Sequence, residues 1–308
     1  MFRKISIVLV IVFAGLILQA QQKTLQERLG YSKNAKLLII HADDLGVSHS
    51  ENQASFTALE RGSVRSASIM VPTPWFTEVA GYAASHPQAD LGLHLTLTSE
   101  WDMYKWGPLA NQVNGLKNRL GYFYSTVDSV YRTATAAEVK QELRAQIEKA
   151  REAGIDFTHL DSHMGTLYGR ADYLKAMIEL GHEYKVPVML QKPGPGSEMI
   201  VNLDSLINDN DVIADAIVGA GPADFTSGMA AYYTKTLKAL KPGLSILIIH
   251  TAYDDKEMQA VTIGHPDWGA AWRQADYDFF TNDSCKKMLK EQGIQVITWR
   301  EIRDKLIR

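Results

Sequence analysis

Short apolar runs alternate with longer stretches of helical periodicity along most of the chain. The apolar runs predict β-strands at residues 37–40, 91–97, 157–160, 186–190, 245–249 and 295–298. The helical periodicity predicts α-helices at residues 51–61, 136–153, 171–184, 230–240 and 284–292. Gly154 and Gly293 directly follow two of these helices, where a left-handed C-terminal cap is expected. The alternation favours parallel βα units in an α/β fold.

One segment, residues 99–135, interrupts this alternation because it is long, aromatic and weakly periodic. A segment of this kind between a strand and a helix is typical of a loop that faces a substrate. No linker rich in serine, proline or glycine divides the chain. A length of 308 residues fits one α/β barrel, so the pattern predicts a single folded domain.

The N-terminal segment differs in kind from the rest of the chain. Two basic residues, Arg3 and Lys4, precede an apolar stretch at residues 5–18, and residues 19–22 are mostly polar. This is the pattern of a signal peptide. The apolar stretch is also shorter than the roughly 20 residues that cross a bilayer comfortably.

The expected cleavage position is near Ala20, which supplies the small residue that cleavage requires. Leu18 departs from the small residue that is usual two positions earlier, so a retained N-terminal anchor is the alternative. We expect a signal peptide at residues 1–20 and a domain at residues 21–308 that is exported to the periplasm or secreted. After cleavage, this domain is not expected to be inserted in the membrane.

Composition limits the partners that this domain could have. Hydrophobic residues make up 46% of the chain and charged residues 22%, which is typical of a soluble globular protein. The formal net charge is −3 and basic residues form no run, which argues against nucleic acid or an anionic membrane as a partner. Cys285, the only cysteine, cannot form an internal disulfide and receives no role. The sequence does not define the oligomeric state.

The histidines are concentrated where predicted strands end. Five of the nine occupy strands or the residues just after them: His41, His94, His159, His163 and His250. In a parallel β/α barrel the carboxyl ends of all strands meet on one face, so residues far apart in sequence come together there. Such convergence is what a metal site needs.

Three short motifs contain most of these histidines: HADDLG at residues 41–46, GLHLTLT at residues 92–98 and THLDSH at residues 158–163. The first places two carboxylates side by side after a strand, where one could bind a cation while the other acts as a base. In the second, strand alternation places His94 on the polar face. Taken singly, each motif has a structural explanation, as a helix cap or as a hydrogen-bonded interior histidine.

Together, the strands that each deliver a histidine or an aspartate to one face favour a metallohydrolase. One carboxylate with two imidazoles leaves coordination positions open, as in catalytic metal sites. Metal-bound histidines commonly give their second ring nitrogen to another polar group, and Asp161 and His159 are the candidates for this orienting role. Mixed nitrogen and oxygen ligands admit zinc, manganese, iron, cobalt or magnesium.

In order and spacing, the three motifs resemble those of the YdjC-like carbohydrate deacetylase family, which includes the chitooligosaccharide deacetylases. The resemblance extends over residues 36–301. It implies an irregular β/α barrel of the polysaccharide-deacetylase type, formed by one domain. It also implies metal ligands at Asp44, His94 and His163, a general base at Asp43, and His250 near the leaving group. Magnesium is the cofactor that the resemblance implies first, with zinc or another transition metal as the alternative.

The reaction implied by the resemblance is hydrolysis of the N-acetyl group of an acetylated oligosaccharide or polysaccharide. The metal would polarise the acetyl carbonyl while Asp43 takes a proton from water. Four tryptophans in expected loops could stack on sugar rings, or could pack the loops onto the barrel: Trp101, Trp106, Trp268 and Trp272. Where relatives continue the third motif with further histidines, this chain has Met164, Gly165 and Thr166, which leaves the preferred sugar open.

Two other functions would fit the same barrel. A phosphoesterase or a sugar isomerase would use the same ions, but the chain has no glycine-rich phosphate cradle and no cluster of basic residues. An exported glycan-binding barrel without activity is the other alternative. The presence of Asp43 beside a full ligand set argues against it.

Overall fold

The computed structural model describes residues 23–192, 201–203 and 205–308. The expected signal peptide at residues 1–20 therefore lies outside the described residues. Within the described part of the chain, no helix combines the length and the apolar character that crossing a membrane would require.

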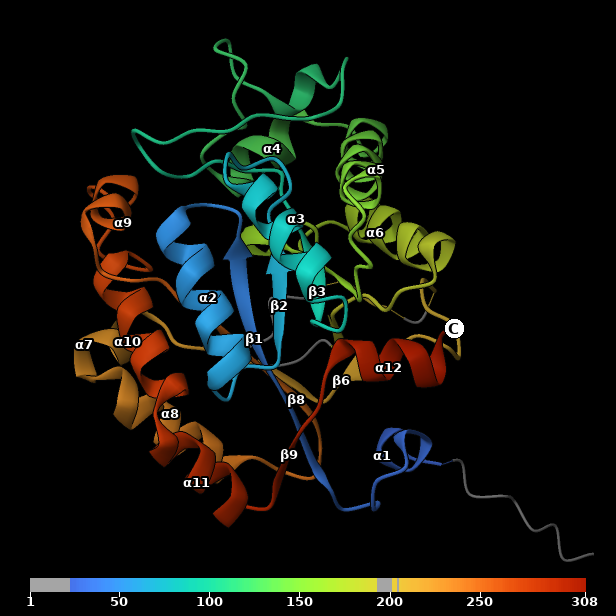
Figure 1. The fold of residues 1–308 in the computed structure, drawn as a ribbon. Helices are drawn as coiled ribbons and strands as arrows, with labels where there is room; N and C mark the ends of the chain where they lie inside the picture. The colour runs from blue at the N-terminus through green and yellow to red at the C-terminus, as the bar shows by residue number, and fades with distance from the viewer. Residues whose placement is uncertain (1–22, 193–200, 204) are drawn as a thin grey trace, which may run out of the picture.

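A parallel sheet curls around the centre of the molecule (Figure 1). Its strands follow the order β4 (Leu160–Ser162), β3 (Leu91–Leu95), β2 (Ser66–Ile69), β1 (Lys36–Leu45), β8 (Gly243–Ile249) and β7 (Ala216–Gly219). A seventh strand, β9 (Ile294–Val296), pairs with the first residues of β1. β1 is buried along almost its whole length, which matches the unbroken apolar run that a central parallel strand requires.

The gap between β4 and β7 is bridged by short strands. Leu160 in β4 forms a parallel bridge with Val188. Two residues later the chain enters β5 (Leu190–Gln191), which pairs with β6 (Ile213–Ala214), and β6 leads into β7 after one residue. These contacts carry the curled sheet almost around to its starting edge. The predicted irregular, single-domain β/α barrel is thereby confirmed.

Helices cover the outside of the curled sheet (Figure 1). The helices of ten residues or more are α2 (His49–Arg61), α3 (Phe76–Ser85), α5 (Ala136–Glu152), α6 (Ala171–Tyr184), α8 (Met229–Ala239) and α10 (Ala270–Thr281). The shorter ones are α1 (Leu25–Leu29), α4 (Val127–Thr133), α7 (Pro222–Ser227), α9 (Lys256–Val261), α11 (Asp283–Glu291), α12 (Trp299–Leu306), and the 3-10 turns at Asn114–Leu116 and His163–Gly165. α5 shows why such helices form where they do. Thr135 and Glu138 build a capping box, and Val139, Leu143 and Ile147 then bury one face.

Five predicted helices, now α2, α5, α6, α8 and α11, are confirmed, and Gly154 and Gly293 adopt the expected left-handed conformation. The strand predicted at residues 157–160 was placed too early, because β4 begins at Leu160. The prediction missed β2, whose Ser66–Ile69 sequence carries two serines and lacks a long apolar run. It also missed α3, α10 and α12.

The two ends of the barrel differ. The long segment around α4 lies over the carboxyl ends of the strands, whereas α12 lies toward their amino ends (Figure 1). Asp90, just before β3, accepts hydrogen bonds at 2.8 Å from the backbone N–H groups of Trp299 and Arg300 in the first turn of α12. This carboxylate at a helix N-terminus fixes α12 as the floor of the barrel.

Candidate metal centre

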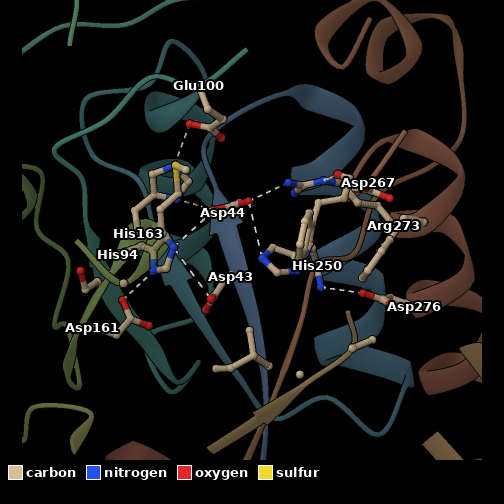
Figure 2. Close-up of a pocket in the computed structure, with 18 of the residues that line it drawn as sticks. Asp43, Asp44, His94, Glu100, Asp161, His163, His250, Asp267, Arg273 and Asp276 are labelled. Carbon is tan, nitrogen blue, oxygen red and sulfur yellow. Dashed lines mark hydrogen bonds and ion pairs between the residues drawn. The ribbon is translucent and has the colours of Figure 1, made fainter. Parts of the chain in front are cut away.

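Three side chains with metal-binding chemistry meet at the carboxyl ends of the strands. Asp44 Oδ1 lies 3.4 Å from His94 Nε2 and 3.3 Å from His163 Nδ1. Asp44 is the next-to-last residue of β1, His94 comes from β3, and His163 directly follows β4. Figure 2 shows the two imidazoles on one side of the Asp44 carboxylate. All three residues are buried.

The free atoms of this cluster fit a cation. Asp44 Oδ1 is buried and has no hydrogen-bond partner, although buried carboxylate oxygens normally have one. The other ring nitrogens are already used, because His94 Nδ1 lies 2.8 Å from Asp161 Oδ1 and His163 Nε2 lies 3.0 Å from Glu100 Oε2. Each imidazole therefore turns one uncommitted nitrogen toward Asp44 Oδ1. A divalent ion is the partner that satisfies one carboxylate oxygen and two such nitrogens at once.

The charges around the cluster favour an ionised Asp44. Burial opposes ionisation, but the positive charges of Arg273 and His163 hold the pKa of Asp44 well below its usual value. Burial likewise opposes a charge on His163, whereas Glu100 and Asp44 raise its pKa to about 10. A cation bound at Asp44 Oδ1 would displace the proton from His163 Nδ1, because an imidazole binds a metal only as the neutral ring.

An irregularity in β1 brings both neighbouring carboxylates to this site. The strand register shifts between Ala42 and Leu45, and Asp44 has a left-handed backbone with φ of 71°. In a regular strand, consecutive side chains point to opposite faces. Gly46 completes the bend with φ of 100°, and a β-carbon there would lie 2.8 Å from Thr73 Oγ1. Asp43 and Asp44 can therefore line the same pocket.

Asp43 stands beside the cluster with one oxygen held and one directed into the site. Its Oδ1 lies 3.0 Å from His41 Nε2 and accepts a hydrogen bond from Ser68 Oγ at 3.2 Å. Its Oδ2 lies 3.8 Å from His94 Nε2, whereas Asp44 Oδ1 lies 3.4 Å from the same nitrogen. The geometry gives the two aspartates different surroundings, as a ligand and a base would have.

Arg273, which the sequence analysis missed, anchors the other oxygen of Asp44. Its Nη2 donates to Asp44 Oδ2 at 2.8 Å and its Nη1 to Glu51 Oε2 at 2.7 Å. The guanidinium group comes from α10 and Glu51 from α2, so two outer helices fix the orientation of the Asp44 carboxylate. The remaining oxygen, Oδ1, is left available to a cation.

His250 lies on the far side of Asp44, with Nε2 at 3.9 Å from Asp44 Oδ2 (Figure 2). Its backbone N–H donates to Asp276 Oδ2 at 2.9 Å, and Tyr233 donates to Asp276 Oδ1 at 2.5 Å. Burial lowers the pKa of His250 to about 4, although the Asp44 charge opposes this shift. His250 is therefore a neutral imidazole near pH 7.

A pocket of about 930 Å³ opens above the cluster. The segment predicted to face a substrate contributes Glu100, Trp101, Ser125 and Thr126 to its lining, so it lies where a substrate-facing segment would have to lie. The sequence did not identify Glu100 as a partner of His163, because no motif links two residues so far apart along the chain.

The four tryptophans proposed for sugar stacking have different surroundings. Trp268 lines the pocket with 39% of its surface exposed. Trp101 and Trp272 also line it but are 3% and 1% exposed. Trp106 is buried, donates from Nε1 to Thr98 O, and is absent from the described residues that line the pocket.

Asp161 and His159 also differ from one another. Asp161 contacts His94, as an orienting carboxylate would. His159 lies toward the barrel floor, where its ring stacks on Trp299 at 5.1 Å between centroids and its Nε2 is 3.9 Å from Asp161 Oδ2. His41, which received no role from the sequence, contacts Asp161 directly instead.

The curled parallel barrel carries an Asp–His–His cluster and a separate carboxylate at the carboxyl ends of its strands. This arrangement places the chain among β/α-barrel proteins with a candidate metal centre. Within that class, the chain belongs to the YdjC-like protein family, whose model matches residues 37–291. This confirms the resemblance found in the three sequence motifs.

Two relatives match over most of their length. A carbohydrate deacetylase of Thermus thermophilus is 32% identical over 92% of this chain and 99% of its own. A carbohydrate deacetylase of Brevibacillus brevis is 29% identical over 86% of this chain and 99% of its own. A crystal structure from Enterococcus faecalis, assigned provisionally to cellobiose-phosphate cleavage, has a TM-score of 0.73 and 23% identity, covering 87% of this chain and 99% of that one. This last similarity shows the fold alone.

Proposed function

We propose that this chain is a metal-dependent carbohydrate deacetylase that hydrolyses the acetamido group of an N-acetylated oligosaccharide or polysaccharide. The observation that carries the proposal is the unpartnered Oδ1 of Asp44, which faces one free nitrogen each of His94 and His163. Asp43 stands beside this cluster in the same pocket. The two relatives named carbohydrate deacetylases support the choice of reaction.

A divalent cation held by Asp44, His94 and His163 would supply Lewis-acid polarisation of the acetyl oxygen and would acidify water. The remaining steps belong to the chain itself. Asp43 Oδ2 is free to remove a proton from the attacking water, because His41 and Ser68 hold only Oδ1. Asp43 can then return that proton to the nitrogen as the C–N bond breaks, which yields acetate and a free amine. A neutral His250 has no spare proton for this step, and it is placed to hydrogen-bond the departing group.

The identity of the cation is part of the proposal. The family resemblance implies magnesium first. The two imidazole nitrogens of His94 and His163 favour zinc or another transition metal, because magnesium prefers oxygen ligands. Elemental analysis of purified protein distinguishes the two.

Trp268 is proposed as the platform for a sugar ring. Its ring stacks on Trp272 at 4.9 Å, and Trp272 stacks on Phe225 at 5.0 Å. The Trp268 backbone has φ of 55°, an uncommon conformation for a bulky residue. The Trp268 carbonyl accepts a hydrogen bond from Arg273 Nε at 2.7 Å. The same guanidinium group binds Asp44, so the platform is tied to the metal centre by a single side chain. A pyranose ring has an apolar face that stacks on such an aromatic surface.

Trp268→Ala is expected to raise KM for an acetylated oligosaccharide about 10-fold, since one stacking contact contributes about 1.4 kcal/mol. Trp75→Ala is the matched control, because Trp75 is 38% exposed and contacts the His49 ring at 5.2 Å between centroids, outside the described pocket lining. Steady-state kinetics at equal metal occupancy measure the effect. An unchanged KM in Trp268→Ala would remove this residue from the sugar site.

The departure at Met164, Gly165 and Thr166 bears on the sugar. Met164 lines the pocket, is 46% exposed and has a left-handed φ of 52°. The family resemblance implies further histidines at these positions, and this chain places a thioether there instead. We propose that this part of the pocket selects a sugar other than the one preferred by relatives with histidines there.

Acetate release tests the proposed function. We expect purified protein to release acetate from N-acetylated chitooligosaccharides or another acetylated glycan, to lose this activity after treatment with a chelator, and to regain it when a divalent metal is added. Bound metal without acetate release from any acetylated glycan would instead support the non-catalytic glycan-binding barrel.

A phosphate-directed reaction has less support. Arg273 is the only lysine or arginine among the described residues that line the pocket. Its guanidinium nitrogens already bind Asp44, Glu51 and the carbonyl of Trp268. Phosphate binding commonly uses arginine or lysine side chains that are free to contact it.

The compartment is likewise a proposal. We propose that residues 1–20 direct export and that residues 21–308 form the mature catalytic domain. N-terminal sequencing of the exported protein decides this point: a start near Gln21 supports it, and a retained Met1 in the membrane fraction contradicts it.

A further inference from the structure

His41 lies at the centre of a buried hydrogen-bonded chain below the metal centre. It precedes Asp43 by two residues on β1, so both side chains point to the same face of the strand. Its Nε2 lies 3.0 Å from Asp43 Oδ1 and 2.9 Å from Asp161 Oδ2. Its Nδ1 lies 2.9 Å from Ser66 Oγ. The imidazole is completely buried.

The chain of contacts continues from His41 to a metal-binding residue. Asp161 divides its two oxygens, with Oδ2 on His41 Nε2 and Oδ1 on His94 Nδ1. The uninterrupted path therefore runs from Asp43 through His41 and Asp161 to His94. It links the carboxylate proposed as general base to a histidine proposed as metal ligand through one shared imidazole.

We infer that His41 is a positioning residue that fixes the general base and the metal-binding histidine relative to one another. This inference rests on the proposed function. By holding Asp43 Oδ1, His41 leaves Oδ2 as the oxygen that faces the pocket. By holding Asp161 Oδ2, it keeps Asp161 Oδ1 directed at His94, which in turn keeps His94 Nε2 directed at Asp44.

The charge of His41 strengthens both contacts. Burial opposes a charge on the ring, but Asp161 and Asp43 outweigh it and raise the pKa of His41 to about 10. Hydrogen bonds from a charged donor to carboxylates are shorter and stronger than neutral ones. In the charged ring both nitrogens are donors, so Nδ1–H donates to Ser66 Oγ and the single Nε2–H is shared between two carboxylates.

Three variants separate this role from simple filling of the barrel interior. His41→Phe keeps a ring but removes both donors. His41→Gln removes the charge but keeps an NH2 group whose two N–H donors can serve Asp43 and Asp161. His159→Phe is the matched control, because His159 is also completely buried, packs edge-on against His41 at 4.9 Å, and is not hydrogen-bonded to Asp43.

His41→Phe is expected to lower kcat on the acetylated oligosaccharide by roughly 10- to 100-fold with KM unchanged, and to weaken metal binding about 10-fold. His41→Gln is expected to recover most of the lost kcat. His159→Phe should change both quantities less than about threefold. Kinetics at saturating metal, competition with a chromophoric chelator and thermal melting measure the three properties separately.

The proposal is overturned if His41→Phe leaves both kcat and metal affinity unchanged, or if His159→Phe causes the same losses. Should His41→Phe fail to fold, His41→Asn replaces it, because its shorter amide cannot reach both carboxylates. His41→Asn must then have a lower kcat than His41→Gln. Equal kcat values of these two variants would refute the positioning role of His41. If the parent protein releases no acetate, the proposed function fails, and metal affinity alone still decides the role of His41.

Discussion

The Asp43→Asn variant is expected to lose about 10²- to 10⁴-fold in kcat while keeping its metal. Asparagine has the same shape as aspartate but cannot accept the proton of the attacking water. Asp43 is outside the Asp44, His94 and His163 cluster and shares a second possible grouping only with His94 and Asp161. Both Asp161 oxygens are already engaged by His41 and His94, so we expect the metal at the Asp44 cluster and its content to remain that of the parent. Acetate-release kinetics and elemental analysis on the same preparation measure the two quantities.

Added metal provides the control for this variant. No concentration of metal can supply a missing proton acceptor, so kcat should stay low when the metal is in large excess. If excess metal restores Asp43→Asn, then Asp43 is a ligand and the roles of Asp43 and Asp44 are reversed. Full activity of Asp43→Asn without added metal would contradict the proposed mechanism itself.

His94→Ala and His163→Ala are expected to weaken metal binding by at least about 10²-fold, and activity should fall with metal occupancy. Changes to residues that only orient a metal ligand already cost about 10- to 100-fold, and removal of a ligand should cost more. Histidine variants test the site more cleanly than Asp44→Asn, because loss of the Asp44 charge would also leave Arg273 with Glu51 as its only carboxylate partner.

His182→Ala is the control for these two variants, since His182 is a surface histidine that pairs with Asp211. It should bind metal as the parent does. In the His94 and His163 variants, high metal concentrations should restore part of the activity by mass action. A variant that binds metal with parental affinity would show that the replaced histidine is not a ligand.

Much of the barrel is predictable because its strands and helices carry strong local patterns. The apolar run of β1 and the capped, amphipathic α5 are examples. β2 escaped prediction because its two serines point into the polar interior, where they contact His41 and Asp43. A strand that serves the site therefore lacks the apolar pattern by which strands are found.

The three residues of the candidate metal cluster were predictable because each lies near the end of an apolar strand or directly after one. Their partners Arg273 and Glu100 were not, since one lies on an outer helix and the other in a loop, at distances along the chain that no motif defines. The left-handed bend at Asp44 was hidden for another reason. That conformation is usually marked by glycine, and here an aspartate adopts it.

The pairing of β1 has a consequence for how this protein acquires its structure. β1 is the first strand in the sequence, yet Lys36 pairs with Gly243 and with Ile294, from β8 and β9. Contacts between such distant segments require closing long loops and are associated with slow folding. The central strand stays incompletely hydrogen-bonded until nearly the whole chain is available. Because Asp43 and Asp44 lie on that same strand, we expect the metal centre to be among the last features to become ordered during folding.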